Sequence, residues 1–268
     1  MLTTRLTRGT AIFLIIESIL LTVCAIILQA VFEFPAILTR PAAVVFPLFM
    51  KTSAIVVPTY YAFALSSLFL VPLAFLVQRI LSPRPSLFSQ ITVTVGVMTG
   101  IFQVLGFIRW PFLVPYLATT YTNPQTSDAT RQAIVVFYQA FNIYAGHTIG
   151  EHLGFLFNAA WGVLVGIAIL RSPLFSTWKW VGWLGILFSI GILGNPLGDL
   201  SLTFLPTSTA YFATTIPVVT LIYLISYSLW IVWLIVVAVR LLLLNQKKLQ
   251  SLEMVEPEVA SFVAVGRD

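Results

Sequence analysis

Residues 149–170 read IGEHLGFLFNAAWGVLVGIAIL, an apolar stretch of 22 residues with Glu151 and His152 near its start. A helix rises about 1.5 Å per residue and the hydrocarbon core of a bilayer is about 30 Å thick, so about 20 apolar residues cross it. The stretch is long enough for one crossing. It is therefore predicted to be a transmembrane helix with a polar entrance.

The rest of the chain repeats this pattern. Of its 268 residues, 59% are hydrophobic and only 9% are charged, and the mean hydropathy is +0.99. This composition excludes a soluble globular protein and indicates an integral membrane protein. Five further segments satisfy the length test, at approximately 9–31, 53–78, 88–110, 178–197 and 216–243. We therefore expect an all-α, polytopic membrane helix bundle with about six transmembrane helices.

The basic residues are distributed as topology signals. The net charge is +5, but Lys and Arg stand in ones and twos at the ends of apolar segments, so the charge does not indicate nucleic-acid binding. One side of the membrane receives Arg5, Arg8, Arg79, Arg84, Arg171, Lys179, Arg240, Lys247 and Lys248. The loops on the other side carry only Arg40, Lys51 and Arg131. The positive-inside rule then places both termini in the cytoplasm.

The chain divides into two parts by composition. Residues 1–244 are expected to form the six-span transmembrane domain. Residues 245–268 are polar and are expected to form a cytoplasmic, partly disordered tail.

The two outer connections, at 32–52 and 111–148, are long. In the second, Ser127 is placed to cap a helix. Apolar residues then recur at helical spacing and form one face of this helix: Ile134, Phe137, Phe141 and Tyr144. We expect an amphipathic helix that lies on the bundle or in the outer interface. Gly146 and Gly150 allow a bend from it into the next span, although one continuous helix also fits the sequence.

His147, Glu151 and His152 are the first candidate site residues. On an α-helix with about 100° per residue, Glu151 lies about 40° from His147, and Asn158 continues the same polar stripe. His152 lies about 140° from His147, so the two imidazoles converge on one metal ion only if the helix breaks near Gly150. The spacing also differs from the His-Glu-x-x-His motif and its inverted form. The metal site is therefore a weak hypothesis, with candidate ligands His147, Glu151, His152 and Asp199.

Other polar side chains are predicted at the same depth. Arg109 lies about 30 Å above the inner end of its span, and Asp199 follows the span at 178–197. Because an isolated charge in hydrocarbon is costly, Arg109 is expected to pair with Glu151 or Asp199, or to reach the lipid headgroups. One interpretation is an outer polar cluster that binds a lipid headgroup or a small solute, formed by Arg109, His147, Glu151, Asn158, Asn195 and Asp199. The other is an ion-pair network that only fixes helix packing.

Glu17 stands apart from this cluster. It lies in FLIIESILL, about 12 Å into the first span, with no cation of another span at its depth. A carboxyl in this position is expected to be protonated, as in the relay of a proton-coupled transporter, and Gln29 and Gln103 are candidate members of its network. The simpler interpretation is a neutral acid that hydrogen-bonds to a neighbouring side chain or backbone carbonyl.

Two segments carry a resemblance to a known family. GFIRWPFLVPYLATTY at 106–121 and FNIYAGHTIGEHLGFLFNAAWG at 141–162 resemble the bacterial multi-pass membrane family named domain of unknown function 4386 (DUF4386). The likeness is strongest over residues 96–200 and looser in the first, second and last spans. It implies a single domain of about six helices in the bacterial inner membrane. It implies no catalytic residue, because none is established for the family.

The sequence favours binding over catalysis. We expect an inner-membrane protein that binds a lipid or a membrane partner through the outer polar cluster. The expected partners are membrane lipids, together with a membrane protein or a second copy of the chain, and no cofactor is predicted. Two alternatives stay open: a small proton-coupled transporter that uses Glu17, and a membrane-embedded metal-dependent hydrolase.

Overall fold

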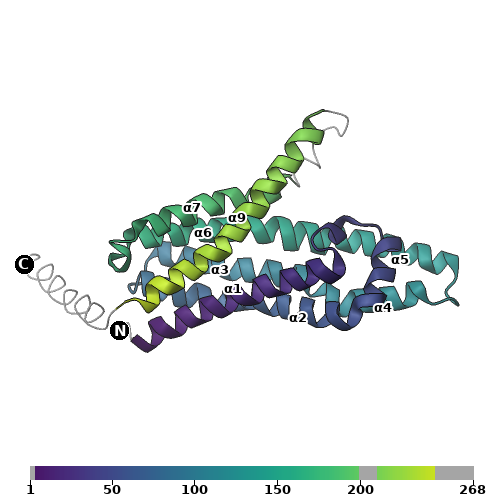
Figure 1. Ribbon diagram of the computed structural model, residues 1–268, viewed down its shortest axis with the longest axis horizontal. Helices are drawn as coiled ribbons and strands as arrows, with labels where there is room; N and C mark the ends of the chain where they lie inside the picture. Colours follow the sequence, from purple (N-terminus) through teal and green to yellow (C-terminus); the bar gives the residue numbers. More distant parts are fainter. Residues whose placement is uncertain (1–3, 199–209, 245–268) are drawn as a thin grey trace, which may run out of the picture.

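Long helices make up most of the chain in the computed structural model, which describes residues 4–198 and 210–244 (Figure 1). The helices are α1 (Thr4–Phe32), α2 (Ala42–Leu81), α3 (Leu87–Phe107), α4 (Arg109–Thr122), α5 (Asp128–Phe141), α6 (Gly154–Arg171), α7 (Lys179–Ile192) and α9 (Ala210–Leu242). Shorter helical segments are η1 (Ala36–Thr39), η2 (Asn142–Leu153) and η3 (Pro173–Phe175). The predicted tail at 245–268 lies outside the described residues.

Six helical segments are long and apolar enough to cross a membrane, which confirms the predicted number. They are Thr4–Phe32, Ala42–Leu81, Leu87–Thr122, Asp128–Arg171, Lys179–Gly198 and Val218–Leu242. Large apolar side chains such as Ile12, Ile26 and Leu187 are exposed on the outside of the bundle. Such a surface suits lipid rather than water as the surrounding solvent.

Several segments extend further than hydropathy predicts. α2 begins at Ala42, so much of the expected outer loop at 32–52 is helical, and Pro47 lies inside the helix. Pro41, in an extended conformation, precedes the first turn of α2. The loop prediction was wrong there because prolines are tolerated within membrane helices, where neighbouring helices and local adjustments compensate for the lost hydrogen bond.

The predicted amphipathic helix exists and is continuous with the span that follows it. Ser127 Oγ accepts a hydrogen bond from the Thr130 backbone N–H at 3.2 Å, as expected for a cap. From Asp128 the helix continues through α5, η2 and α6 as one segment of 44 residues. Of the two arrangements that the sequence allowed, the structure therefore has the continuous helix. α4 and α5 lie together at the right of Figure 1, beyond the ends of α1 and α7.

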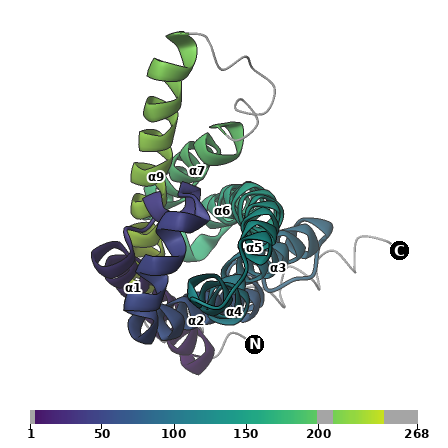
Figure 2. The ribbon, with the colours of Figure 1, turned by 90° about the vertical axis from the view of Figure 1, so that its right-hand side faces the viewer.

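The membrane helices pack as a closed ring. α1 contacts α2, α2 contacts α3, α3 contacts α6, α6 contacts α7, α7 contacts α9, and α9 returns to α1. α1 begins and α9 ends at the same end of the bundle, which we call the terminal end; the opposite end is the far end (Figure 1). Near the far end α9 diverges from the ring, a feature that both views show (Figures 1 and 2). The candidate site lies beside α9 in this region.

Candidate functional site

A cavity of about 800 Å³ lies toward the far end of the bundle. Its walls come from the η1 connection, the α3–α4 junction, η2, the last turn before residue 198, and α9. Most of its surface is apolar. The apolar lining includes Phe34, Phe107, Trp110, Ile143, Phe155 and Leu224, and the polar lining includes Gln103, Arg109, His147, Glu151, His152 and Asn195.

The cavity opens between η1, η2 and α9. Thr220 and Leu224 line it, yet both are exposed, and Leu224 retains 39% of its surface. Exposed lining residues also come from η1, with Ala36 and Thr39, and from η2, with Ile143 and Thr148, so the opening is bordered by η1, η2 and α9. On the α9 side the opening lies at the start of Val218–Leu242, a segment long and apolar enough to cross a membrane.

The polar wall is built on a π-helix. Residues Asn142–Leu153 form η2, in which backbone hydrogen bonds connect residues five apart rather than four. His152 therefore lies one turn from His147, and both side chains line the cavity. The expected separation of about 140° was wrong, because it assumed α-helical geometry. The helix does not break at Gly150; it widens. Insertions of this kind occur frequently at functional sites.

Two glycines allow η2 to approach α3. A Cβ atom on Gly150 would lie 2.6 Å from the Cα atom of Gly106, and a Cβ on Gly106 would lie 2.6 Å from the Cα of Gly150. The two backbones are thus in direct contact, and neither can move away as a flexible side chain would. Any side chain at this crossing must separate α3 from the π-helix that carries His147 and Glu151.

Gly150→Ala is expected to destabilise the protein by about 2 kcal/mol, because the added methyl group meets backbone atoms. The melting temperature of the detergent-purified variant measures the effect. Gly9→Ala is the control, since a Cβ on Gly9 meets no atom within 4 Å. Equal melting temperatures for the two variants would show that the crossing is not tightly packed.

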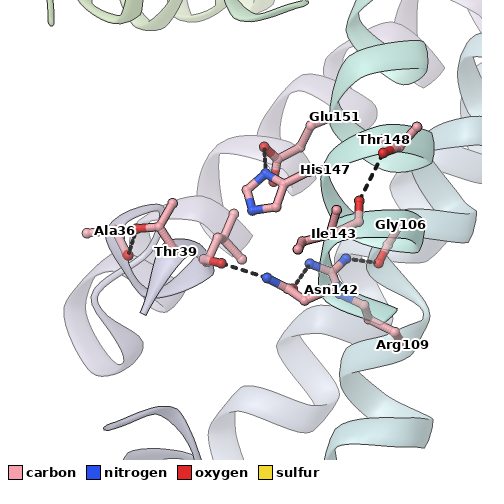
Figure 3. Close-up of polar contacts among 10 residues, drawn as sticks. Ala36, Thr39, Gly106, Arg109, Asn142, Ile143, His147, Thr148 and Glu151 are labelled. Atoms are coloured by element: carbon pink, nitrogen blue, oxygen red, sulfur yellow. Dashed lines mark hydrogen bonds and ion pairs between the residues drawn. The ribbon is translucent and has the colours of Figure 1, made fainter. Parts of the chain in front are cut away.

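His147 and Glu151 form a pair at the cavity wall. His147 Nδ1 lies 3.0 Å from Glu151 Oε2 (Figure 3), and the two side chains are 29% and 21% exposed. A carboxylate at one ring nitrogen fixes the orientation of the imidazole, and with it the position of the other nitrogen. The pair is therefore a preorganised polar group in an otherwise apolar cavity.

Arg109 is held by different partners from those expected. Its guanidinium is buried and donates hydrogen bonds to the Gly106 carbonyl and, at 2.9 Å, to Asn142 Oδ1. Asn142 Nδ2 in turn donates to the Leu38 carbonyl at 2.8 Å (Figure 3). Asn142 in the first turn of η2 and the end of α3 supply these acceptors, whereas Glu151 acts on Arg109 through its charge. Asp199, the other expected partner, lies outside the described residues. A Cβ on Gly146 would lie 2.5 Å from Arg109 Nη2, so the glycine makes room for the guanidinium.

The remaining predicted site residues are divided among three places. Asn195 lines the cavity, and its Oδ1 atom is buried without a hydrogen-bond partner in the described part of the chain. Asn158 and Glu17 are fully buried and are not among the lining residues. Asn158, which was expected in the outer polar cluster, therefore lies outside the cavity. Asp199 lies outside the described residues. Within those residues, no group of three or more His, Cys, Asp or Glu side chains is placed to hold a metal ion.

Sequence reasoning missed the role of Asn142 and the lining contributed by η1. Asn142 was detectable as a polar side chain between the apolar residues Phe141 and Ile143, in the segment where the amphipathic helix meets a span. The η1 lining, which includes Ala36 and Thr39, carried no signal because those residues have no distinctive chemistry.

The family described as domain of unknown function (DUF4386) matches residues 13–238. That range contains every residue that lines the cavity. The chain belongs to the DUF4386 family. No curated protein and no solved structure matches it. The chemistry of this DUF4386 protein must therefore be argued from its own cavity.

The cavity of this DUF4386 protein combines two kinds of surface. Aromatic and aliphatic side chains supply most of the wall, while a carboxylate, a guanidinium and two imidazoles are grouped on the side of η2 and α4. Pockets that bind small molecules are typically apolar, with a few polar groups that fix the orientation of the ligand. An arrangement of this kind suits a molecule with an apolar body and a polar head.

Proposed function

We propose that the cavity binds a membrane lipid, whose chains lie along Phe155 and Leu224 and whose polar head lies beside the His147–Glu151 pair. The observation that carries this proposal is a largely apolar cavity whose opening is bordered on one side by Thr220 and Leu224, at the start of a helix long enough to cross a membrane. A lipid enters through such an opening without leaving the bilayer.

The charges in the cavity favour a zwitterionic headgroup. Glu151 supplies a negative charge and Arg109 a positive one, and both side chains line the cavity. Two of the guanidinium nitrogens already donate to Gly106 and Asn142, so Arg109 contributes mainly through its charge. In a headgroup with both an ammonium and a phosphate group, the ammonium can lie near Glu151 and the phosphate near Arg109. A purely anionic headgroup would bring its phosphate close to Glu151.

We also propose that the protein lies in the bacterial inner membrane with both termini in the cytoplasm. The distribution of Lys and Arg supports this orientation, since the terminal end of the bundle carries Arg5, Arg8, Arg79, Arg84, Arg171, Lys179 and Arg240. The cavity then faces the outer leaflet. Reporter fusions at residues 82–86 and 123–127 test the orientation, and the first site must report the cytoplasm.

Native mass spectrometry of the purified protein tests the binding proposal. After exchange into nanodiscs with equal amounts of phosphatidylethanolamine and phosphatidylglycerol, the wild type is expected to retain phosphatidylethanolamine. Glu151→Gln and His147→Ala are each expected to retain about tenfold less, because each removes a charge-assisted contact from an apolar site.

The control and the contradicting results are equally specific. Arg131→Gln removes the exposed pair with Asp128 on α5, at 3.5 Å, and is expected to retain lipid as the wild type does. A wild-type protein that retains no lipid contradicts the proposal. Stoichiometric metal in the wild type, lost in Glu151→Gln and His147→Ala, would favour the metal-dependent hydrolase instead.

A further inference from the structure

Glu17 is a buried carboxyl that the lipid cavity does not use. Its side chain has no exposed surface, and neither of its oxygens has a hydrogen-bond partner in the described part of the chain. It lies on α1 between Leu14, which belongs to one apolar cluster of the bundle, and Leu21, which belongs to the other. Ionisable groups buried inside membrane bundles are rare and mark proton or ion sites.

A row of buried polar atoms leads from the cavity into the bundle along α6. Gln103 lines the cavity, and its Nε2 atom has no partner among the described residues. Its Cγ atom would lie 3.0 Å from a Cβ on Gly154. Asn158 follows one turn later on the same face of α6, is fully buried, and has no partner for either amide atom in the described chain.

The row continues through the next turn of α6. A Cβ on Gly162 would contact Ser189 Oγ and would lie 3.0 Å from Trp230 Nε1, so both atoms converge on this glycine. Each is buried without a partner in the part of the chain that the structure describes. Positions 154, 158 and 162 are four residues apart, so the polar groups beside them follow one face of α6 at intervals of one turn.

The line ends at Trp230 on α9, the helix that packs against α1, which carries Glu17. Trp230 stacks on Tyr227, with ring centroids 5.8 Å apart and planes 11° apart. Tyr227 in turn interacts electrostatically with Glu17 across the contact between α9 and α1. On α1 itself Cys24 is the other group that interacts with Glu17.

Buried polar atoms without protein partners are usually satisfied by internal water, which typically makes about three hydrogen bonds to such groups. We propose that Glu17 is a proton-binding site that exchanges its proton with the cavity through a water-filled column past Asn158 and Trp230. In the exchange the carboxyl releases a proton to a water molecule and becomes a carboxylate, and the reverse step restores it. The cavity supplies the entrance for water, whether or not it also holds a lipid.

Infrared spectroscopy under hydrogen–deuterium exchange tests this proposal. The wild type in nanodiscs at neutral pH is expected to show the C=O stretch of a protonated carboxyl that is missing in Glu17→Gln. After transfer to D₂O this band is expected to shift within minutes. Asn158→Leu, which removes an amide from the middle of the column, is expected to slow the shift at least tenfold.

Gln78→Leu is the matched control. Gln78 is also a buried glutamine whose amide atoms have no partner in the described chain, but it lies on α2 next to the terminal end. Its replacement is expected to leave the exchange rate unchanged. Gln103→Leu, where the column meets the cavity, repeats the test if Asn158→Leu does not fold.

Three results would overturn the proposal: no band that Glu17→Gln removes, a band that does not shift in D₂O, or a shift equally fast in Asn158→Leu and Gln103→Leu. Lipid retention by the same variants separates this proposal from the lipid proposal. Glu17→Gln is expected to retain phosphatidylethanolamine as the wild type does, because Glu17 does not line the cavity. A loss of lipid with normal exchange would affect only the proposed lipid function.

Discussion

Replacing Asn142 by leucine is expected to lower the free energy of unfolding by about 3 kcal/mol. The substitution keeps the volume nearly unchanged but removes the acceptor for Arg109 Nη2 and the donor to the Leu38 carbonyl. Arg109 is only 6% exposed, so water cannot easily replace the lost acceptor. A buried charge that loses a partner is among the most destabilising changes that a single substitution makes.

A double-mutant cycle distinguishes this explanation from a simple packing defect. Arg109→Met removes the charge, and the double variant Arg109→Met/Asn142→Leu leaves only apolar groups at the site. If the cost comes from the unpaired guanidinium, the double variant is expected to be more stable than Asn142→Leu alone. Unfolding in mixed detergent micelles measures all four proteins. Additive losses would contradict the role assigned to the Arg109–Asn142 bond.

Filling the cavity is expected to remove bound lipid almost completely. Ala36 and Thr220 line the cavity from η1 and from α9, and both are exposed, so larger side chains are tolerated there without a buried clash. Two indoles at these positions, in Ala36→Trp/Thr220→Trp, occupy the entrance and the space for the lipid chains. Retention of phosphatidylethanolamine is expected to fall by at least tenfold, with little change in melting temperature.

The control introduces the same side chains elsewhere. Ile12 and Leu187 are exposed on the outside of the bundle and do not line the cavity. Ile12→Trp/Leu187→Trp therefore tests the effect of two added indoles on lipid-facing surfaces in general. Equal retention by the two double variants would mean that lipid binds around the bundle rather than inside it.

The membrane spans could be predicted because the bilayer imposes them. Each crossing needs about 20 apolar residues with internally satisfied backbone groups, and that requirement is visible in the hydropathy of every span. The extensions of α2 and α4 beyond the spans were not predictable by the same test. Pro41 and Pro47 indicated a loop, but their effect depends on the neighbours that support the helix, which the sequence does not state.

The site was predictable in part for a related reason. The spacing of His147 and Glu151 indicated a shared helix face, and the two side chains do meet. The position of His152 was not predictable, because periodicity analysis assumes 3.6 residues per turn and η2 has the wider hydrogen-bonding pattern of a π-helix. The role of Asn142 was missed because the cost of an isolated charge in hydrocarbon was expected to be met by a carboxylate. The buried Arg109 guanidinium instead donates hydrogen bonds to an amide oxygen and a backbone carbonyl.

Electron cryo-microscopy of the protein in nanodiscs that contain phosphatidylethanolamine tests the central claim most directly. The lipid proposal predicts elongated density that enters beside Thr220 and Leu224, passes Phe155, and ends in a headgroup within hydrogen-bonding distance of the His147–Glu151 pair. A cavity filled by its own side chains, or one that holds only separate water-sized densities while lipids coat the outside of the bundle, would contradict it.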